Sequence, residues 1–269
     1  MYRLFQKAIE KGQSEGLTSL LTSASHYGQQ RFRDYSIRLS VPLKYKMRYG
    51  MSAPPRNTII HVNPSNIEHF VYPAFFRDHK ISRIEGGEWD KEAESKSIRS
   101  HSPSADRRLF PIQEYDMYQS MCEHFQNGER WSDTEIYSIA KQKLENNESW
   151  YHGCTTIDEL DKRFEYVDEL YEKIKTDGYK PAEQLGNGSK DEVIVNITRD
   201  GKIVMDDGRH RLLIAKILDL DSIPVWVHVR HEEWQKKRVA LWNGGDTINQ
   251  DDRDYRTFQD HPDICKQGK

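Results

Sequence analysis

A run of alternating strand and helix patterns in the last third of the chain constrains the fold most. Residues 193–197, "VIVNI", are typical of a buried strand, and the turn "TRDG" joins them to residues 202–205, "KIVM", as a hairpin. A compact apolar run then predicts a helix over about residues 209–218. "IPVWVHV", residues 223–229, predicts another strand. This order of strand, strand, helix and strand predicts an α/β fold of the α+β mixed-sheet kind.

Positive charge gathers where the predicted helix begins. Arg209, His210 and Arg211 follow Asp207 and Gly208. A helix N-terminus exposes unpaired N–H groups and a partial positive charge, and a glycine before it lets a ligand approach the backbone. Arginine adds a fork that matches phosphate, and histidine adds a hydrogen bond or a titrating proton. The pattern therefore predicts a phosphate-binding site formed by these five residues.

An ordinary explanation of the same residues stays open. Consecutive helical residues point about 100° apart, so Arg209, His210 and Arg211 do not all face one ligand. One arginine would then pair with Asp206 or Asp207, and another would lie on the surface. Adjacent aspartates face opposite sides of an extended chain, and we expect Asp207 to cap the helix and meet the ligand.

The sequence "VIVNITRDGKIVMDDGRHRLLIAKILDLDSIPVWV" resembles the core of the ParB/sulfiredoxin superfamily. The resemblance covers about residues 166–230, and "IIHVNPSNI", residues 59–67, is similar to the family's first strand. The long insertion between them departs from the family pattern. The matching residues of the core are Asp207, Gly208, Arg209, His210, Arg211, Ala215, Ile223, Pro224 and Val225.

The resemblance implies a nucleotide or phosphate pocket at the start of this helix. Family members use it for nucleotide binding and hydrolysis, for phosphorylation chemistry and for a debated nuclease activity. Archaeal proteins labelled ParB-like nuclease domain proteins also share a "GG(D/E)WD" element. Sulfiredoxin chemistry needs a cysteine next to the Gly-His-Arg element, and residue 209 of this chain is an arginine. The residues after Val229 do not resemble the helix-turn-helix domain of partition proteins. Both of those activities are therefore disfavoured.

The element "RIEGGEWD", residues 83–90, places Glu88 and Asp90 beside two glycines. Mg²⁺ in phosphate sites prefers one or two carboxylates, and either residue could also act as a general base. We therefore predict Glu88 and Asp90 as metal ligands and, with His210, as catalytic residues. The alternative is a structural turn in which Trp89 enters the core and Asp90 caps a helix.

Arg230 and His231 end the last predicted strand. Ligand sites of α/β proteins commonly open at strand ends, so we expect both residues to line the phosphate pocket. Three further helices are predicted, with the clearest over residues 155–176 because of its apolar spacing, the Thr156–Glu159 capping box and the terminating Gly178. The others cover residues 113–125 and 132–144, the latter capped by Ser132 or Asp133.

Charge is unevenly distributed along the 269 residues. The net charge is only −3, which disfavours a global basic field for nucleic acid. Residues 1–50, however, carry nine Lys/Arg against three acids, a pattern typical of either a solvated face or an arm that contacts phosphates or a membrane surface. Three dispersed cysteines, Cys122, Cys154 and Cys265, and the lack of a long apolar stretch favour a soluble, cytoplasmic protein.

These patterns predict three parts. They are a basic helical arm over residues 1–55, a ParB/sulfiredoxin-like domain over 56–235 with a helical insertion at about 91–150, and an irregular acidic tail over 236–269. The leading functional hypothesis is a nucleotide- or phosphate-binding protein, a phosphotransferase or nucleotide hydrolase using Mg²⁺ with a nucleoside triphosphate or diphosphate. The alternatives are a nucleic-acid binding or cleaving module and a noncatalytic, nucleotide-switched binding protein.

Overall fold

A computed structural model describes residues 36–37, 39–75, 81–94, 98, 105–148, 153–185, 192–242 and 260–264. The chain forms two compact units, Met1–Pro54 and Pro55–Lys269. No helix in the described part of the chain is both long enough and apolar enough to cross a bilayer.

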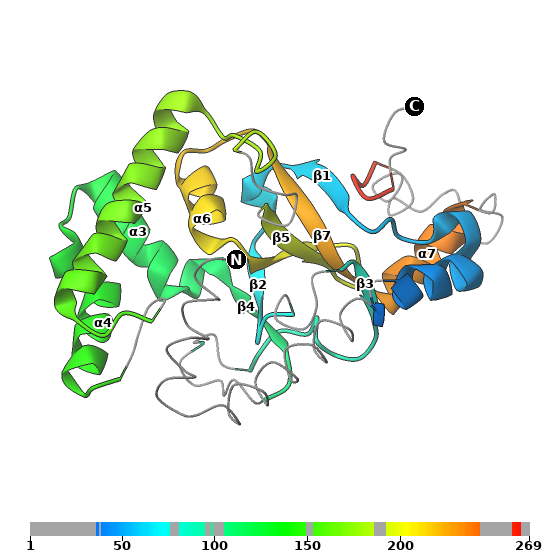
Figure 1. The fold of residues 1–269 in the computed structure, drawn as a ribbon, viewed down its shortest axis with the longest axis horizontal. Coiled ribbons are helices and arrows are strands. Elements are labelled where there is room, and N and C mark those ends of the chain that lie inside the picture. The colour runs from blue at the N-terminus through cyan, green and yellow to red at the C-terminus, as the bar shows by residue number, and fades with distance from the viewer. Residues whose placement is uncertain are drawn as a thin grey trace, which may run out of the picture. The chain divides into compact units, whose positions relative to one another are not determined.

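The described part of the first unit is mostly one helix. This segment, called here the basic helix, covers residues 36–37 and 39–49, and the short 3₁₀ helix η1 (Gly50–Ser52) follows it (Figure 1, blue). The Ser52 hydroxyl donates a 2.7 Å hydrogen bond to the Tyr49 carbonyl oxygen, which helps to close the last turn.

The second unit is built on a mixed sheet of seven strands in the order β1-β7-β5-β6-β2-β4, with β3 pairing β7 off this path. Strand β5 is antiparallel to β6, as the predicted hairpin requires, and it is parallel to β7. The mixed α/β class is thereby confirmed. The strands are β1 (Thr58–Val62), β2 (His69–Tyr72), β3 (Arg83–Glu85), β4 (Arg108–Pro111), β5 (Val193–Ile197), β6 (Ile203–Asp207) and β7 (Ile223–His231).

Helices cover one side of this sheet. Figure 1 shows α6 between the strands and the neighbouring helices α3 and α5, with α4 farther out, while α7 lies near the other end of β7. The 3₁₀ helices η2 (Pro64–Asn66), η4 (Ile112–Glu114) and η5 (Trp131–Asp133) lie in the connections. The α-helices are α3 (Asp116–Asn127), α4 (Glu135–Glu145), α5 (Ile157–Asp177), α6 (Arg209–Ile217) and α7 (Glu232–Trp242).

Two apolar clusters hold the sheet. The main one joins alternate residues of β5 and β7 to the buried faces of α3, α4, α5 and α6. A smaller cluster on the second unit contains Val71, Phe75, Trp89, Leu109, Val204 and Val229. Because β5 and β7 are buried along their whole length, both faces of the central strands are covered, as their nearly continuous apolar sequences indicate.

A bulge interrupts the pairing of β5 with β7. The register shifts between Val195 and Asn196, which removes a backbone partner from the ladder. The Asn196 side-chain oxygen accepts a 3.1 Å hydrogen bond from the Val229 N–H and so satisfies a buried donor. The polar residue inside "VIVNI" is therefore explained by the irregular ladder.

Most predicted elements are confirmed, with local corrections. The predicted cap of α4 at Ser132 or Asp133 is wrong, because the helix begins at Glu135 after Thr134. The capping box of α5 is partly confirmed: the Thr156 hydroxyl accepts from the Glu159 N–H at 3.2 Å, while the Glu159 carboxylate accepts from Thr155.

The expectation that Asp207 caps α6 is also wrong. Gly208 occupies the N-cap position with a left-handed φ of 84° and provides no side chain. A Cβ at Gly208 would lie only 2.9 Å from the Val193 Cα, so the glycine is required both by the backbone angle and by the closeness of β5.

We expect Gly208→Ala to lower the free energy of unfolding by about 3 kcal/mol, because it combines left-handed strain with a backbone clash. Gly128→Ala is the matched control, since Gly128 has a φ of 80° but open space around its Cβ position. The control should cost only about 1 kcal/mol. Urea denaturation followed by circular dichroism measures both values, and equal losses would contradict the proposed role of the Val193 contact.

Candidate anion site between α5 and α6

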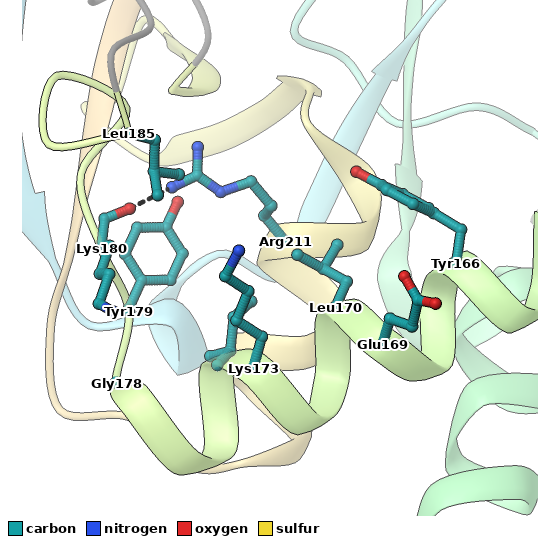
Figure 2. A pocket seen from close by; sticks show the side chains of 10 residues that line it. Tyr166, Glu169, Leu170, Lys173, Gly178, Tyr179, Lys180, Leu185 and Arg211 are labelled. Atoms are coloured by element: carbon teal, nitrogen blue, oxygen red, sulfur yellow. Dashed lines mark hydrogen bonds between the residues drawn. The ribbon is translucent and has the colours of Figure 1, made fainter.

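A pocket of about 220 Å³ lies between the C-terminal half of α5, the following loop and the first turn of α6. Figure 2 shows its side chains, with Tyr166, Glu169, Leu170 and Lys173 projecting from α5. The loop after α5 forms a second wall of the pocket, and α6 contributes one arginine. The remaining lining residues are Ile174, Gly178, Tyr179, Lys180, Leu185 and Arg211.

Arg211 is the residue of the predicted phosphate cluster that reaches this pocket. Its Nη2 donates a 2.8 Å hydrogen bond to the Lys180 carbonyl oxygen (dashed in Figure 2), and its guanidinium lies 4.5 Å from the centre of the Tyr179 ring. On its other side, Nη1 lies 3.4 Å from the buried carboxylate of Glu192. These contacts orient the guanidinium before any ligand binds.

Glu192 joins the loop to α6. One of its carboxylate oxygens accepts a hydrogen bond from the Ala182 N–H, and the other faces Arg211. Tyr179 packs in the same cluster, where burial raises the pKa of its hydroxyl well above the usual value and nearby Arg211 offsets this only in part. The tyrosine therefore stays neutral and serves as an aromatic wall with a polar tip.

Two lysines and one carboxylate complete the polar lining. Lys173 is exposed on α5, and Lys180 forms a 2.7 Å ion pair with Asp177. The hydrogen bond and charge of Lys180 lower the pKa of the Asp177 carboxyl. Three cations and the single acid Glu169 line the pocket, so its own lining has an excess of positive charge. The pocket thus combines aromatic and aliphatic walls with cationic donors.

The other members of the predicted phosphate cluster point elsewhere. Arg209 is exposed, and its Nη1 donates a 2.8 Å hydrogen bond to the Tyr115 hydroxyl. Asp207, Gly208 and the half-buried His210 do not line the pocket. The expectation that three consecutive side chains diverge is confirmed for the two arginines. The partner of Arg211 is Glu192, however, which replaces the predicted Asp206 or Asp207.

The element "RIEGGEWD" forms a second polar cluster. Trp89 is buried against Phe75 and His231, as the structural alternative predicts. Asp90 does not cap a helix; both of its carboxylate oxygens accept hydrogen bonds from Arg199 in the β5–β6 turn, at 2.6–3.0 Å. Burial raises the pKa of Asp90, but the bonds from Arg199 outweigh it and leave the pKa below its usual value.

These carboxylates do not fit the predicted Mg²⁺ site. Asp90 is engaged by Arg199, and Glu88 forms an ion pair with Lys91 and another with Arg199 at 3.3 Å. Among the described residues, no group of three or more His, Cys, Asp or Glu side chains is arranged to hold a metal ion. Their geometry indicates that the pair anchors the hairpin turn.

Arg230 and His231 also bind partners of this chain. Arg230 is fully buried and donates from Nε and Nη2 to Asp263, with Nε–Oδ2 at 3.0 Å. His231 Nε2 donates to the Gly87 carbonyl oxygen at 3.0 Å, while its Nδ1 accepts from the Glu233 N–H. Residues 260–264 of the predicted acidic tail thus contact the sheet.

The predicted site residues therefore fall into two places. Arg209 follows the end of β6, beside the start of β5, whereas Arg230 pairs with Ile197 at the opposite end of β5. The four residue steps between Val193 and Ile197 separate these ends by roughly 13 Å. The structure does not bring Glu88, Asp90, Arg230 and His231 to the first turn of α6, contrary to the prediction of one pocket.

Sequence reasoning missed the contribution of α5. Four of the lining residues lie three or four positions apart and so share one face of α5: Tyr166, Glu169, Leu170 and Lys173. This shared face is the local signal for the pocket wall, and it is distinct from the apolar stripe that predicts the helix. The pocket itself depends on the loop after Gly178, whose path has no clear local signal.

Comparisons of the chain with protein-family models, with curated proteins and with solved structures find no match. The resemblance to the ParB/sulfiredoxin superfamily therefore remains a prediction.

Replacing Asp90 with Asn should lower the free energy of unfolding by about 1–2 kcal/mol at neutral pH, because Arg199 loses its ion pair but can turn partly toward solvent. Since the folded-state pKa of Asp90 is lowered, its contribution is full above the unfolded value and disappears as pH falls through the folded value. Denaturant titrations between neutral and acidic pH should show that the difference in the free energy of unfolding between the wild-type protein and Asp90→Asn becomes smaller as the pH falls. Glu88→Gln, on the exposed neighbour, should leave the midpoint unchanged.

Proposed function

We propose that this protein binds a small phosphorylated ligand in the pocket between α5 and α6, with a nucleotide as the expected class. The observation that carries the proposal is the joint presence of Arg211, Lys173 and Lys180 around walls formed by Tyr166 and Tyr179. Arginine and lysine bind phosphate oxygens, and tyrosine rings pack against planar or apolar groups.

The preset orientation of Arg211 supports an anion-binding role. Its contacts with Lys180 and Glu192 fix the guanidinium, so less side-chain entropy is lost when a phosphate binds. Glu192 and Asp177 already balance Arg211 and Lys180, so the lining provides directed donors more than a strong field. Exposed Lys173 supplies the charge that is most open to a ligand.

The size of the pocket restricts the ligand. A volume of about 220 Å³ is below the 300–1,000 Å³ typical of pockets for drug-sized molecules. It is enough for the phosphate end of a mononucleotide, or for a small phosphorylated metabolite, and favours these over a nucleic-acid strand lying in an extended groove. This argument supports the small-ligand hypothesis over the nucleic-acid alternative.

Phosphoryl transfer and nucleotide hydrolysis remain predictions beyond this proposal. Glu169 is the carboxylate among the pocket-lining residues, while Glu88 and Asp90 lie near the opposite end of β5. Mg²⁺ enters only as an ion that accompanies the phosphates of a bound nucleotide. Release of inorganic phosphate, measured after binding is established, separates an enzyme from a nucleotide-switched binding protein.

Thermal unfolding with ATP, ADP, CTP and GTP, with and without Mg²⁺, tests binding directly. A ligand present at a hundred times its Kd should raise the Tm by roughly 5–10 °C, because it stabilises only the folded protein. Lys173→Gln should weaken binding roughly tenfold through loss of a charged donor. Calorimetric titration gives the corresponding Kd values.

Lys175→Gln is the matched control, because Lys175 is on the same helix and is not among the lining residues. It should leave the Kd unchanged. Arg209→Gln should also have little effect, since that side chain is directed toward Tyr115. If Arg209→Gln lost binding while Lys173→Gln bound normally, the ligand would bind near Arg209 at the N-terminus of α6, and the proposal would be overturned.

A further inference from the structure

The basic helix presents an exposed apolar stripe. Leu39, Leu43 and Met47 recur every four residues, with exposed fractions of 50%, 62% and 82%. Met51 in η1 continues the series at 75%. Four large apolar side chains on one face of a short segment form an unusual surface, because such residues are normally exposed singly.

Cationic side chains border this stripe on both sides. At about 100° per residue, the stripe from Leu39 to Met47 spans about 80° of the helix circumference. Lys46 lies about 20° outside one edge and Lys44 about 60° beyond the other, while Arg48 lies about 100° beyond that edge, next to the opposite face. All three basic residues are exposed. Basic side chains on either side of an apolar stripe are typical of a helix that lies at a lipid–water interface.

The opposite face of the helix is more covered. Val41, Pro42, Tyr45 and Tyr49 are half-buried, so the helix already has an inner face, and the apolar stripe is not part of it. The Tyr45 and Tyr49 rings lie 6.2 Å apart on that inner face. The exposed stripe is therefore a second apolar surface.

The charge of this segment is of one sign. No Asp or Glu occurs between Asp34 and Glu68, so nothing in the sequence there offsets the lysines and arginines. A nucleic acid would match the charge but would give the leucine and methionine side chains no apolar region in which to bury. An anionic bilayer surface matches both features, because its headgroups attract cations and its acyl chains accept apolar side chains.

We propose that the basic helix binds the surface of anionic phospholipid bilayers, with the stripe Leu39, Leu43, Met47 and Met51 inserted below the headgroups. Lys44 and Lys46 contact the headgroup phosphates from the two edges of the stripe. The helix lies in the plane of the interface and does not span the membrane. This role is separate from ligand binding between α5 and α6.

Sedimentation of the full chain with lipid vesicles tests the proposal. Vesicles of equal parts phosphatidylcholine and phosphatidylglycerol should bind at least tenfold more tightly than pure phosphatidylcholine, and added salt should weaken the binding. The double variant Leu43→Ser/Met47→Ser should lower the partition coefficient at least tenfold, through loss of buried apolar area. Lys44→Ser/Lys46→Ser should remove most of the preference for anionic vesicles.

Ile157→Ser, at an exposed apolar residue of α5, is the control and should bind vesicles normally. Circular dichroism and thermal unfolding of each variant establish that its fold is retained. Equal binding to neutral and anionic vesicles, or unchanged binding of Leu43→Ser/Met47→Ser, would overturn the proposal. So would concentration-dependent dimers abolished by that variant, or DNA binding that depends on Lys44 and Lys46 but not on Leu43.

Discussion

The complete burial of β7 is the constraint on which much of the second unit depends. Nine consecutive residues are shielded from water, and His228, Arg230 and His231 are among them. A buried polar side chain is costly unless it finds a partner. Each of these three obtains one from a different segment: Asp206 from β6, Asp263 from near the C-terminus and the Gly87 carbonyl oxygen after β3.

The same principle shapes the pocket between α5 and α6. Buried Glu192 contacts both the Ala182 N–H and Arg211, which ties a loop without regular structure to a helix. The loop in turn places Tyr179 and Lys180 opposite α5. The buried ion pair of Glu192 with Arg211 therefore lies beside the pocket, and it links the loop and the helix that line it.

Local patterns predicted much of this fold but little of its polar pairing. Apolar spacing is a local property of the sequence, and it predicts the strands at residues 193–197 and 223–229 and helix α6. Arg199 and Asp90 are 109 residues apart, and no local rule joins them. For the same reason, the sequence grouped Glu88, Asp90 and Arg211 into one site, whereas the sheet places them at different ends.

The partner of Arg230 has a consequence for the timing of folding. Asp263 follows it by 33 residues and meets a second buried guanidinium, Arg238, whose pKa burial lowers to about 10. During synthesis, β7 is complete well before the carboxylate that neutralises its arginine has been made. The central strand of this unit therefore cannot reach its final electrostatic state until Asp263 has been added and has paired with Arg230.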